Sequence, residues 1–259
     1  MELLIPVLIG FVLGFLIGLT GVGGGALVAP SLYVILGMSY GEAVALSLIY
    51  SVFTKIVSAV QHLRQGTVLW KITLLYGLTG IPGAVLGSQV IYWASEGARR
   101  VFPFVMGGVL FLVAGLMLME TGVRAIAARE KPFSPYRITW QGALAIGGFQ
   151  LAVGALMGLT SIGSGSLVIL SMVYLFRMSA SEIVGSNIVI ALIMVVPAAL
   201  THYLAAGVDW RLLALLSVGS LGGAVLGSKS TMILPDRALK IAIAALVVAG
   251  AVLTIVKAW

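Results

Sequence analysis

The sequence predicts an all-α polytopic membrane protein made of two homologous halves. Its 259 residues are 61% hydrophobic and only 9% charged, whereas a soluble domain carries about 25% charged residues. The segment 14–88 also aligns without a gap on 154–228, with 25 of the 75 positions identical. Because so many apolar side chains cannot be hidden from water, the solvent must be lipid, and the repeat indicates that both halves share one fold.

Apolar stretches separated by short polar breaks run from one end of the chain to the other. Most of them approach the ~20 residues that a helix needs to span a bilayer. Two of them, 26–37 and 166–176, are too short to span upright, and each follows a glycine-rich segment. We therefore expect about eight full spanning helices plus two short broken or re-entrant segments. The other stretches are 3–19, 43–63, 70–93, 101–119, 139–160, 183–205, 211–229 and 238–257.

The first stretch has an alternative interpretation as a signal peptide. It lacks a basic n-region and further hydrophobic segments follow it, so we expect a mature helix. The chain contains no cysteine, which excludes disulfides, thiolate metal sites and cysteine nucleophiles. Its net charge of +7 lies in loops, where it reports topology rather than binding to nucleic acid.

The longest polar break separates the two halves. We interpret 1–120 as the N-terminal transmembrane repeat, 121–138 as a basic linker and 139–259 as the C-terminal transmembrane repeat. Basic loops stay in the cytoplasm, so the linker is expected there. An inverted second half then places 10 Lys and Arg residues inside and 4 outside, whereas parallel repeats place 8 inside and 6 outside. The inverted arrangement is favoured, and the parallel one remains the alternative.

Glycines spaced four residues apart recur in both halves. In lipid, small residues at this spacing let helix backbones approach closely. We expect these glycines to serve helix packing rather than ligand binding. They are Gly10, Gly14 and Gly18, then Gly83 and Gly87, and their repeats Gly223 and Gly227.

The aligned acids Glu42 and Glu182 invite a paired-carboxylate proposal. Each lies three residues after a serine, Ser39 or Ser179, at the start of an apolar stretch. This spacing is typical of a capping box, which is the interpretation we prefer. The remaining acids are terminal or in loops, so no carboxylate is expected at mid-membrane, which favours an anion over a metal cation as ligand.

Two glycine-rich motifs are the strongest candidates for a binding site. Residues 18–25 align with 158–165, and such a run interrupts a helix. Non-helical backbone at membrane depth survives only when it is buried in protein or lines a wet cavity. The short helices that follow would point their positive N-termini at the break, where they attract an anion. A tight turn with glycines only for packing is the alternative. The expected ligand groups are Thr20, Gly21, Gly23, Gly24 and Gly25, with Thr160, Ser161, Gly163, Ser164, Gly165 and Ser166.

Two polar residues inside spanning stretches add to this site. Lys55 is the basic residue deepest in a predicted span, and Val195 replaces it in the repeat. An ionisable residue in a membrane is a functional hypothesis by default, here a counter-charge for an anion; snorkelling is the alternative. Asn187, which aligns with Ser47, either lines the cavity or bonds a neighbouring helix.

His62 and His202 align and are the only two histidines. Histidine changes charge near neutral pH, so both are candidates for gating or proton coupling. Harmless interfacial histidines are the alternative. Lying on different helices with no acidic companion, they predict no metal site.

The motif Gly18–Gly25 followed by Pro30, its echo 140 residues later and the length resemble the TauE/SafE sulfite exporter family. The resemblance covers nearly the whole chain. It implies an inner-membrane transporter of small sulfur-containing or organic anions, typically sulfite or sulfoacetate leaving the cell. The second copy departs from the pattern, and the added hydroxyls suit oxyanions. Ser161, Ser164 and Ser166 replace Gly21, Gly24 and Ala26, and Leu170 replaces Pro30.

We therefore expect a secondary transporter in the cytoplasmic membrane that exports such an anion by alternating access. No cofactor, enzyme activity or nucleic-acid partner is expected. The partners are the anion and the lipid bilayer, and assembly into a homo-oligomer stays open. The alternatives are a passive anion channel, a membrane-embedded enzyme and a lipid-handling protein.

Overall fold

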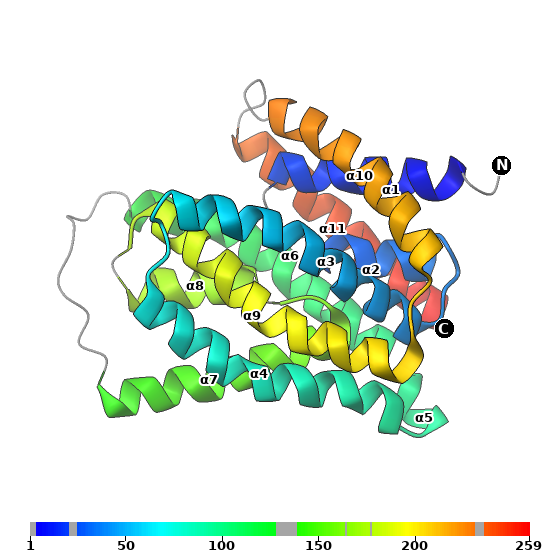
Figure 1. Cartoon of the computed structure of the whole chain (residues 1–259), viewed down its shortest axis with the longest axis horizontal. Coiled ribbons are helices and arrows are strands. Elements are labelled where there is room, and N and C mark those ends of the chain that lie inside the picture. Colours follow the sequence, from blue (N-terminus) through cyan, green and yellow to red (C-terminus); the bar gives the residue numbers. More distant parts are fainter. Residues whose placement is uncertain (1–3, 21–24, 128–138, 164, 177, 231–235) are drawn as a thin grey trace.

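The computed structural model describes residues 4–20, 25–127, 139–163, 165–176, 178–230 and 236–259. These residues are almost entirely helical and contain no strand (Figure 1). Each apolar stretch expected from the sequence forms a helix, which confirms the all-α prediction. The helices are α1 (Leu4–Thr20), α2 (Gly25–Val34), α3 (Tyr40–Arg64), α4 (Trp70–Trp93), α5 (Glu96–Arg99), α6 (Phe102–Ala127), α7 (Trp140–Thr160), α8 (Ser166–Leu175), α9 (Ala180–Ala206), α10 (Trp210–Ser230) and α11 (Asp236–Ala258).

Six of the described helices are long and apolar enough to cross a membrane: α3, α4, α6, α7, α9 and α11. The apolar parts of α1 and α10 are shorter, and α2 and α8 have only 10 residues each. The two short segments expected after the glycine motifs are thus present. At the end of the first half, α6 continues to Ala127, so its last turns lie within the stretch we interpreted as linker.

Each half packs its first helix against the fourth helix of the other half. The contacts between α1 and α10 and between α4 and α7 are the most extensive in the molecule. A Cβ added at Gly14 would lie 2.2 Å from the carbonyl oxygen of Ser220, and one added at Gly154 would lie 2.2 Å from that of Gly80. Gly14 and Gly154 are equivalent positions of the repeat, as are Gly80 and Ser220, so the same close backbone contact occurs twice. The packing role predicted for the spaced glycines is confirmed here.

The two halves are inverted relative to each other. The start of α9 meets the end of α3, where the Leu69 amide donates to Ser186 Oγ at 2.9 Å and Gly185 lies against Thr67. In the same way Gly107, early in α6, lies against Ile255, late in α11. Equivalent helices thus run in opposite directions, as the colour gradient of Figure 1 also shows. The parallel alternative does not hold.

The capping boxes predicted at the two glutamates are confirmed. Ser39 and Glu42 form one at the start of α3, and Ser179 and Glu182 form the other at the start of α9. The Glu42 carboxylate accepts from the Ser39 amide at 3.0 Å, and Glu182 accepts from the Ser179 amide at 2.8 Å. Both carboxylates are therefore engaged at helix ends and are not a catalytic pair.

Candidate functional site

A cavity of about 1190 Å³ lies where the two halves meet. Its walls come from α3, α9 and α10, and further lining comes from Ile17 of α1, from the start of α2, from the end of α7 and from the start of α8. Among the predicted site residues, it is lined by Gly25, Ser161, Gly163, Gly165, Ser166, Asn187, Lys55 and His62. Residues that are far apart in the sequence and belong to both halves therefore face one space.

Other predicted site residues do not line this cavity or are not described. The Thr160 hydroxyl is turned inward, where it donates to the Leu156 carbonyl at 2.6 Å and accepts from the Ile162 amide at 3.1 Å. It closes the end of α7 rather than facing a ligand. His202 is fully buried away from the cavity lining. Thr20 ends α1, but its side chain lies outside the described part, as do Gly21, Gly23, Gly24 and Ser164.

The two glycine motifs touch each other at Gly25 and Ser161. A Cβ added at Gly25 would lie only 2.0 Å from the Ser161 carbonyl oxygen, so a side chain at this position would collide with backbone. Ser161 has φ 63°, a left-handed conformation that ends α7, and its hydroxyl bonds that of Ser47 at 2.9 Å. This contact explains why the first residue of α2 is a glycine.

The first residues of α2 and α8 reach the cavity. Gly25 and Ala26 of α2 line it, as do Gly165 and Ser166 at the start of α8. The first amide groups of a helix have no partner within the helix, and the dipole adds partial positive charge there. This end of the cavity therefore favours a negatively charged ligand.

Asn187 is a second polar group at the cavity that lacks a full set of partners. Its side chain is buried, and Oδ1 has no hydrogen bond with any described residue. Its counterpart Ser47, by contrast, is satisfied by Ser161. Since buried polar atoms are nearly always paired, the Asn187 amide is suited to a ligand or a water in the cavity.

A polar stripe follows one face of α3 along the cavity. It consists of Ser51, Lys55, Ser58 and His62, all of which line the space. The corresponding positions of α9 are Ala191, Val195, Ala198 and His202, which are all buried, although Ala191 and Val195 also border the cavity. Sequence reasoning singled out Lys55 and His62 but missed the two serines, although the spacing of 3 and 4 residues is the signal of one helix face.

Lys55 is the one Lys or Arg among the described residues that line the cavity, and no carboxylate lines it. The side chain is half-buried and forms no hydrogen bond or ion pair with any described residue. An unpaired ammonium and two helix N-termini in one cavity give the space a positive character.

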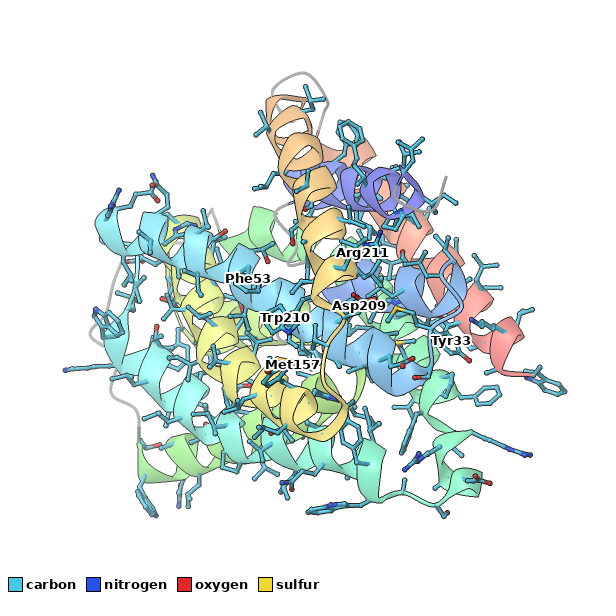
Figure 2. All side chains as sticks on the ribbon, turned by 45° about the vertical axis from the view of Figure 1, so that its right-hand side comes forward. Tyr33, Phe53, Met157, Asp209, Trp210 and Arg211 are labelled. Carbon is cyan, nitrogen blue, oxygen red and sulfur yellow. The ribbon has the colours of Figure 1, made fainter. Side chains whose placement is uncertain are left out.

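The two sides of the inverted structure have different packing. On one side α4 lies along α9, where a Cβ added at Gly77 would be 2.9 Å from the Ile193 side chain. On the other side α10 diverges from α3 and leaves the cavity between them, so that Phe53, the counterpart of Ile193, is 52% exposed. Figure 1 shows α1 and α10 side by side at the upper edge of the molecule, and Figure 2 shows Phe53 on the part of α3 beside α10.

The tight side is further closed by hydrogen bonds. His202 Nε2 donates to the Gly158 carbonyl at 3.0 Å, and the Tyr92 hydroxyl bonds His202 Nδ1 at 2.7 Å. These bonds join α4, α7 and α9. On the open side, α10 meets α3 through a short hydroxyl contact between Tyr50 and Ser220.

The open side lies toward the basic end of the molecule. The cavity follows α3 to His62, two residues before Arg64, and Figure 1 shows this end of α3, the end of α6 and the start of α7 all on the left-hand side of the view. We predicted the segment between α6 and α7 to be cytoplasmic. By that assignment the cavity extends toward the cytoplasm, and the hydrogen-bonded side faces outward.

Comparisons with known proteins give consistent matches. The family model "Sulfite exporter TauE/SafE" matches residues 6–254. The chain is 33% identical over 245 residues to the probable membrane transporter protein YjnA of Bacillus subtilis (strain 168), covering 93% of this chain and 95% of that protein. It is 27% identical over 239 residues to the probable membrane transporter protein YdhB of the same organism, covering 92% and 94%. No solved structure matches the chain.

Proposed function

This chain belongs to the TauE/SafE sulfite exporter family and is a multi-pass membrane transporter, and on that premise we propose that it exports a small oxyanion. The proposed substrate is sulfite or a related sulfur-containing organic anion such as sulfoacetate. The proposed mechanism is alternating access, and the protein is proposed to act as a transporter and not as an enzyme.

The unpaired Lys55, in the same cavity as two helix N-termini, is the observation that supports the substrate class. Its ammonium lines the cavity together with the starts of α2 and α8. No carboxylate among the described residues competes for it. Such a set of groups attracts an anion and repels a cation. The hydroxyls of Ser161 and Ser166 and the side-chain NH2 group of Asn187 are donors of the kind that an oxyanion requires, whereas the unpaired Oδ1 of Asn187 is an acceptor and suits a water.

The unequal packing of the two sides supports alternating access. The α4–α7 pair is closed on α9, whereas the α1–α10 pair is open from α3. The sequence repeat makes these two arrangements structurally equivalent. If the two pairs exchange arrangements, the cytoplasmic side closes and the outer side opens around the same central groups, as in other inverted-repeat transporters.

Counterflow in proteoliposomes tests this function. Vesicles preloaded with unlabelled sulfite should take up labelled sulfite faster than empty vesicles, because a carrier with alternating access is stimulated from the trans side. Lys55→Met should lower this uptake about tenfold, since a hydrogen bond to a charged group contributes about 1.5–3 kcal/mol. Lys71→Met is the matched control, because Lys71 is exposed and does not line the cavity.

Two outcomes would count against the proposal. If Lys55→Met and Lys71→Met take up labelled sulfite at the same rate, Lys55 does not contribute to the binding of the anion. Sulfite flux without any trans-stimulation indicates a channel rather than a carrier.

A further inference from the structure

Lys55 and Val195 occupy equivalent positions but have different surroundings. Val195 also borders the cavity, but its side chain is only 1% exposed and packs within the main hydrophobic core. Lys55 is half-buried, faces the open cavity and has no bonded partner among the described residues. The difference in packing between the two sides is therefore matched by a difference in side-chain chemistry.

Exchange of the two arrangements changes the surroundings of Lys55. When the α1–α10 pair closes on α3, position 55 takes the enclosed place that position 195 has now. Enclosing an ammonium group without a counter-charge is strongly unfavourable. The described lining of the cavity has no carboxylate to supply that charge. The acids of the two wall helices α3 and α9 are Glu42 and Glu182, and both are held in capping boxes.

We infer that Lys55 makes closure of the cytoplasmic side conditional on a bound anion. This inference rests on the proposed function and deepens it. The negative charge of the ligand is the missing partner of Lys55, so the loaded protein closes and the empty protein remains open to the cytoplasm. Lys55 thus acts as a substrate-dependent lock in addition to attracting the anion.

A sidedness of transport follows from this lock. The empty, outward-open state encloses an unpaired Lys55 and is therefore rarely populated. A ligand that needs a rare state binds with an apparent affinity reduced by the fraction of protein in that state. An external anion consequently requires a higher concentration for half-maximal exchange than a cytoplasmic anion does, which favours operation as an exporter.

Paired cysteines can report closure directly because the chain contains no cysteine of its own. Phe53 and Ser217 are the counterparts of Ile193 and Gly77, and a Cβ added at Gly77 would lie 3.1 Å from Ile193 Cβ on the closed side. A disulfide needs Cβ atoms about 3.5–4.5 Å apart. A Phe53→Cys and Ser217→Cys pair should therefore cross-link only when the cytoplasmic side closes. The Gly77→Cys and Ile193→Cys pair serves as the reference for the opposite state.

The rate of disulfide formation is measured in four proteins that all carry the Phe53→Cys and Ser217→Cys pair. They differ at position 55, which is Lys55, Lys55→Arg, Lys55→Met or Lys55→Val. In gluconate buffer without other anions, the methionine and valine variants should cross-link about tenfold faster than the two cationic ones. Methionine keeps the length of lysine without its charge, and valine copies position 195. Sulfoacetate at millimolar concentration should accelerate only the lysine and arginine proteins. Sulfoacetate is chosen over sulfite because sulfite cleaves disulfides.

The outcomes separate this inference from the proposed function. Equal rates in all four backgrounds, with counterflow intact, overturn the lock and leave the transporter proposal standing. Acceleration by sulfoacetate in the valine protein, or its absence in the lysine protein, also overturns the lock. If the Phe53/Ser217 pair never cross-links while the reference pair does, the exchange of arrangements itself is wrong, and the proposed mechanism fails with it.

Discussion

The imidazole of His202 donates from Nε2 to the main-chain carbonyl of Gly158, 3.0 Å away, and so ties α9 to α7. With Nε2 as the donor, Nδ1 of a neutral ring accepts from the Tyr92 hydroxyl, which adds α4 to the cluster. The equivalent histidine, His62, bonds only the nearby Thr67 hydroxyl at 2.9 Å and lines the open cavity. One histidine thus closes its side of the molecule, while its counterpart faces an open one.

Removing the Tyr92 hydroxyl should loosen the closed side. Tyr92→Phe deletes one buried hydrogen bond, which contributes about 0.5–1.5 kcal/mol, so the outward-open state should become roughly fivefold more populated. A single cysteine at Ala198, which is fully buried on α9, reports this as faster alkylation by a membrane-impermeant maleimide added outside. Tyr203→Phe is the control because Tyr203 is exposed and stacks on Trp210. An unchanged alkylation rate would show that this bond does not hold the side shut.

A methyl group between α4 and α7 should destabilise the protein. Gly154→Ala places a Cβ 2.2 Å from the Gly80 carbonyl, so the two helices must separate. Such overpacking costs about 1–3 kcal/mol, and the melting temperature in detergent should fall by several degrees. Gly148→Ala, on the same helix with nothing within 4 Å, should leave the melting temperature unchanged or raise it. Equal melting temperatures for the two variants would contradict the close contact.

The contact between the glycine motifs should tolerate no side chain at position 25. Gly25→Ala puts a methyl group 2.0 Å from the Ser161 carbonyl and should displace the start of α2 from the cavity. We expect sulfite counterflow to fall about a hundredfold, since a displacement of 1 Å at a binding site costs that much. Gly115→Ala, which has open space around it, is the control. Wild-type counterflow by Gly25→Ala would mean that the start of α2 takes no part in the site.

The left-handed residue at the end of α7 gives a pair of variants with different effects on stability. Ser161 has φ 63°, which glycine adopts freely and which is strained for a β-branched residue. Ser161→Gly should preserve the melting temperature while losing the hydroxyl bond to Ser47, and with it part of the sulfite affinity. Ser161→Val should lower the melting temperature, since this strain costs about 1–3 kcal/mol. Identical unfolding of both variants in thermal scans would argue against the left-handed turn.

Much of the fold could be predicted because lipid imposes simple rules on local sequence. Helix positions follow from apolar length, and the starts of α3 and α9 follow from a serine three residues before a glutamate. The close approach at Gly14 and Gly83 follows from the spacing of small residues. Each of these features depends on residues within one or two helical turns, which a single sequence displays directly.

The pairing of α1 with α10 and of α4 with α7 could not be predicted in this way. The contact between Gly14 and Ser220 joins residues more than 200 positions apart, and no local pattern selects the partner. The aligned histidines illustrate a second limit. Their equivalence in sequence suggested equal roles, but His62 and His202 lie on sides with different packing. A repeat predicts a shared fold and does not indicate which half is open.

The candidate site was predictable in its residue types and less so in its geometry. Lys55 and Asn187 line one cavity with Gly25 of the first motif and Ser161, Gly163 and Gly165 of the second. The Thr160 hydroxyl bonds the end of its own helix, a local hydrogen bond that competes with ligand binding and that residue types alone do not indicate.

The pairing of α1 with α10 also has a consequence for biogenesis. Gly14 contacts Ser220, and a ribosome adding about 5–20 residues per second needs roughly 10–40 s to travel between two such positions. During that interval α1 has entered the bilayer but its partner has not been synthesised, so its glycine face must be shielded by lipid or by an insertion chaperone. The first half made alone would keep α1 and α4 without their partners. Completion of the chain, rather than of either repeat, is therefore the event that commits this protein to its native assembly.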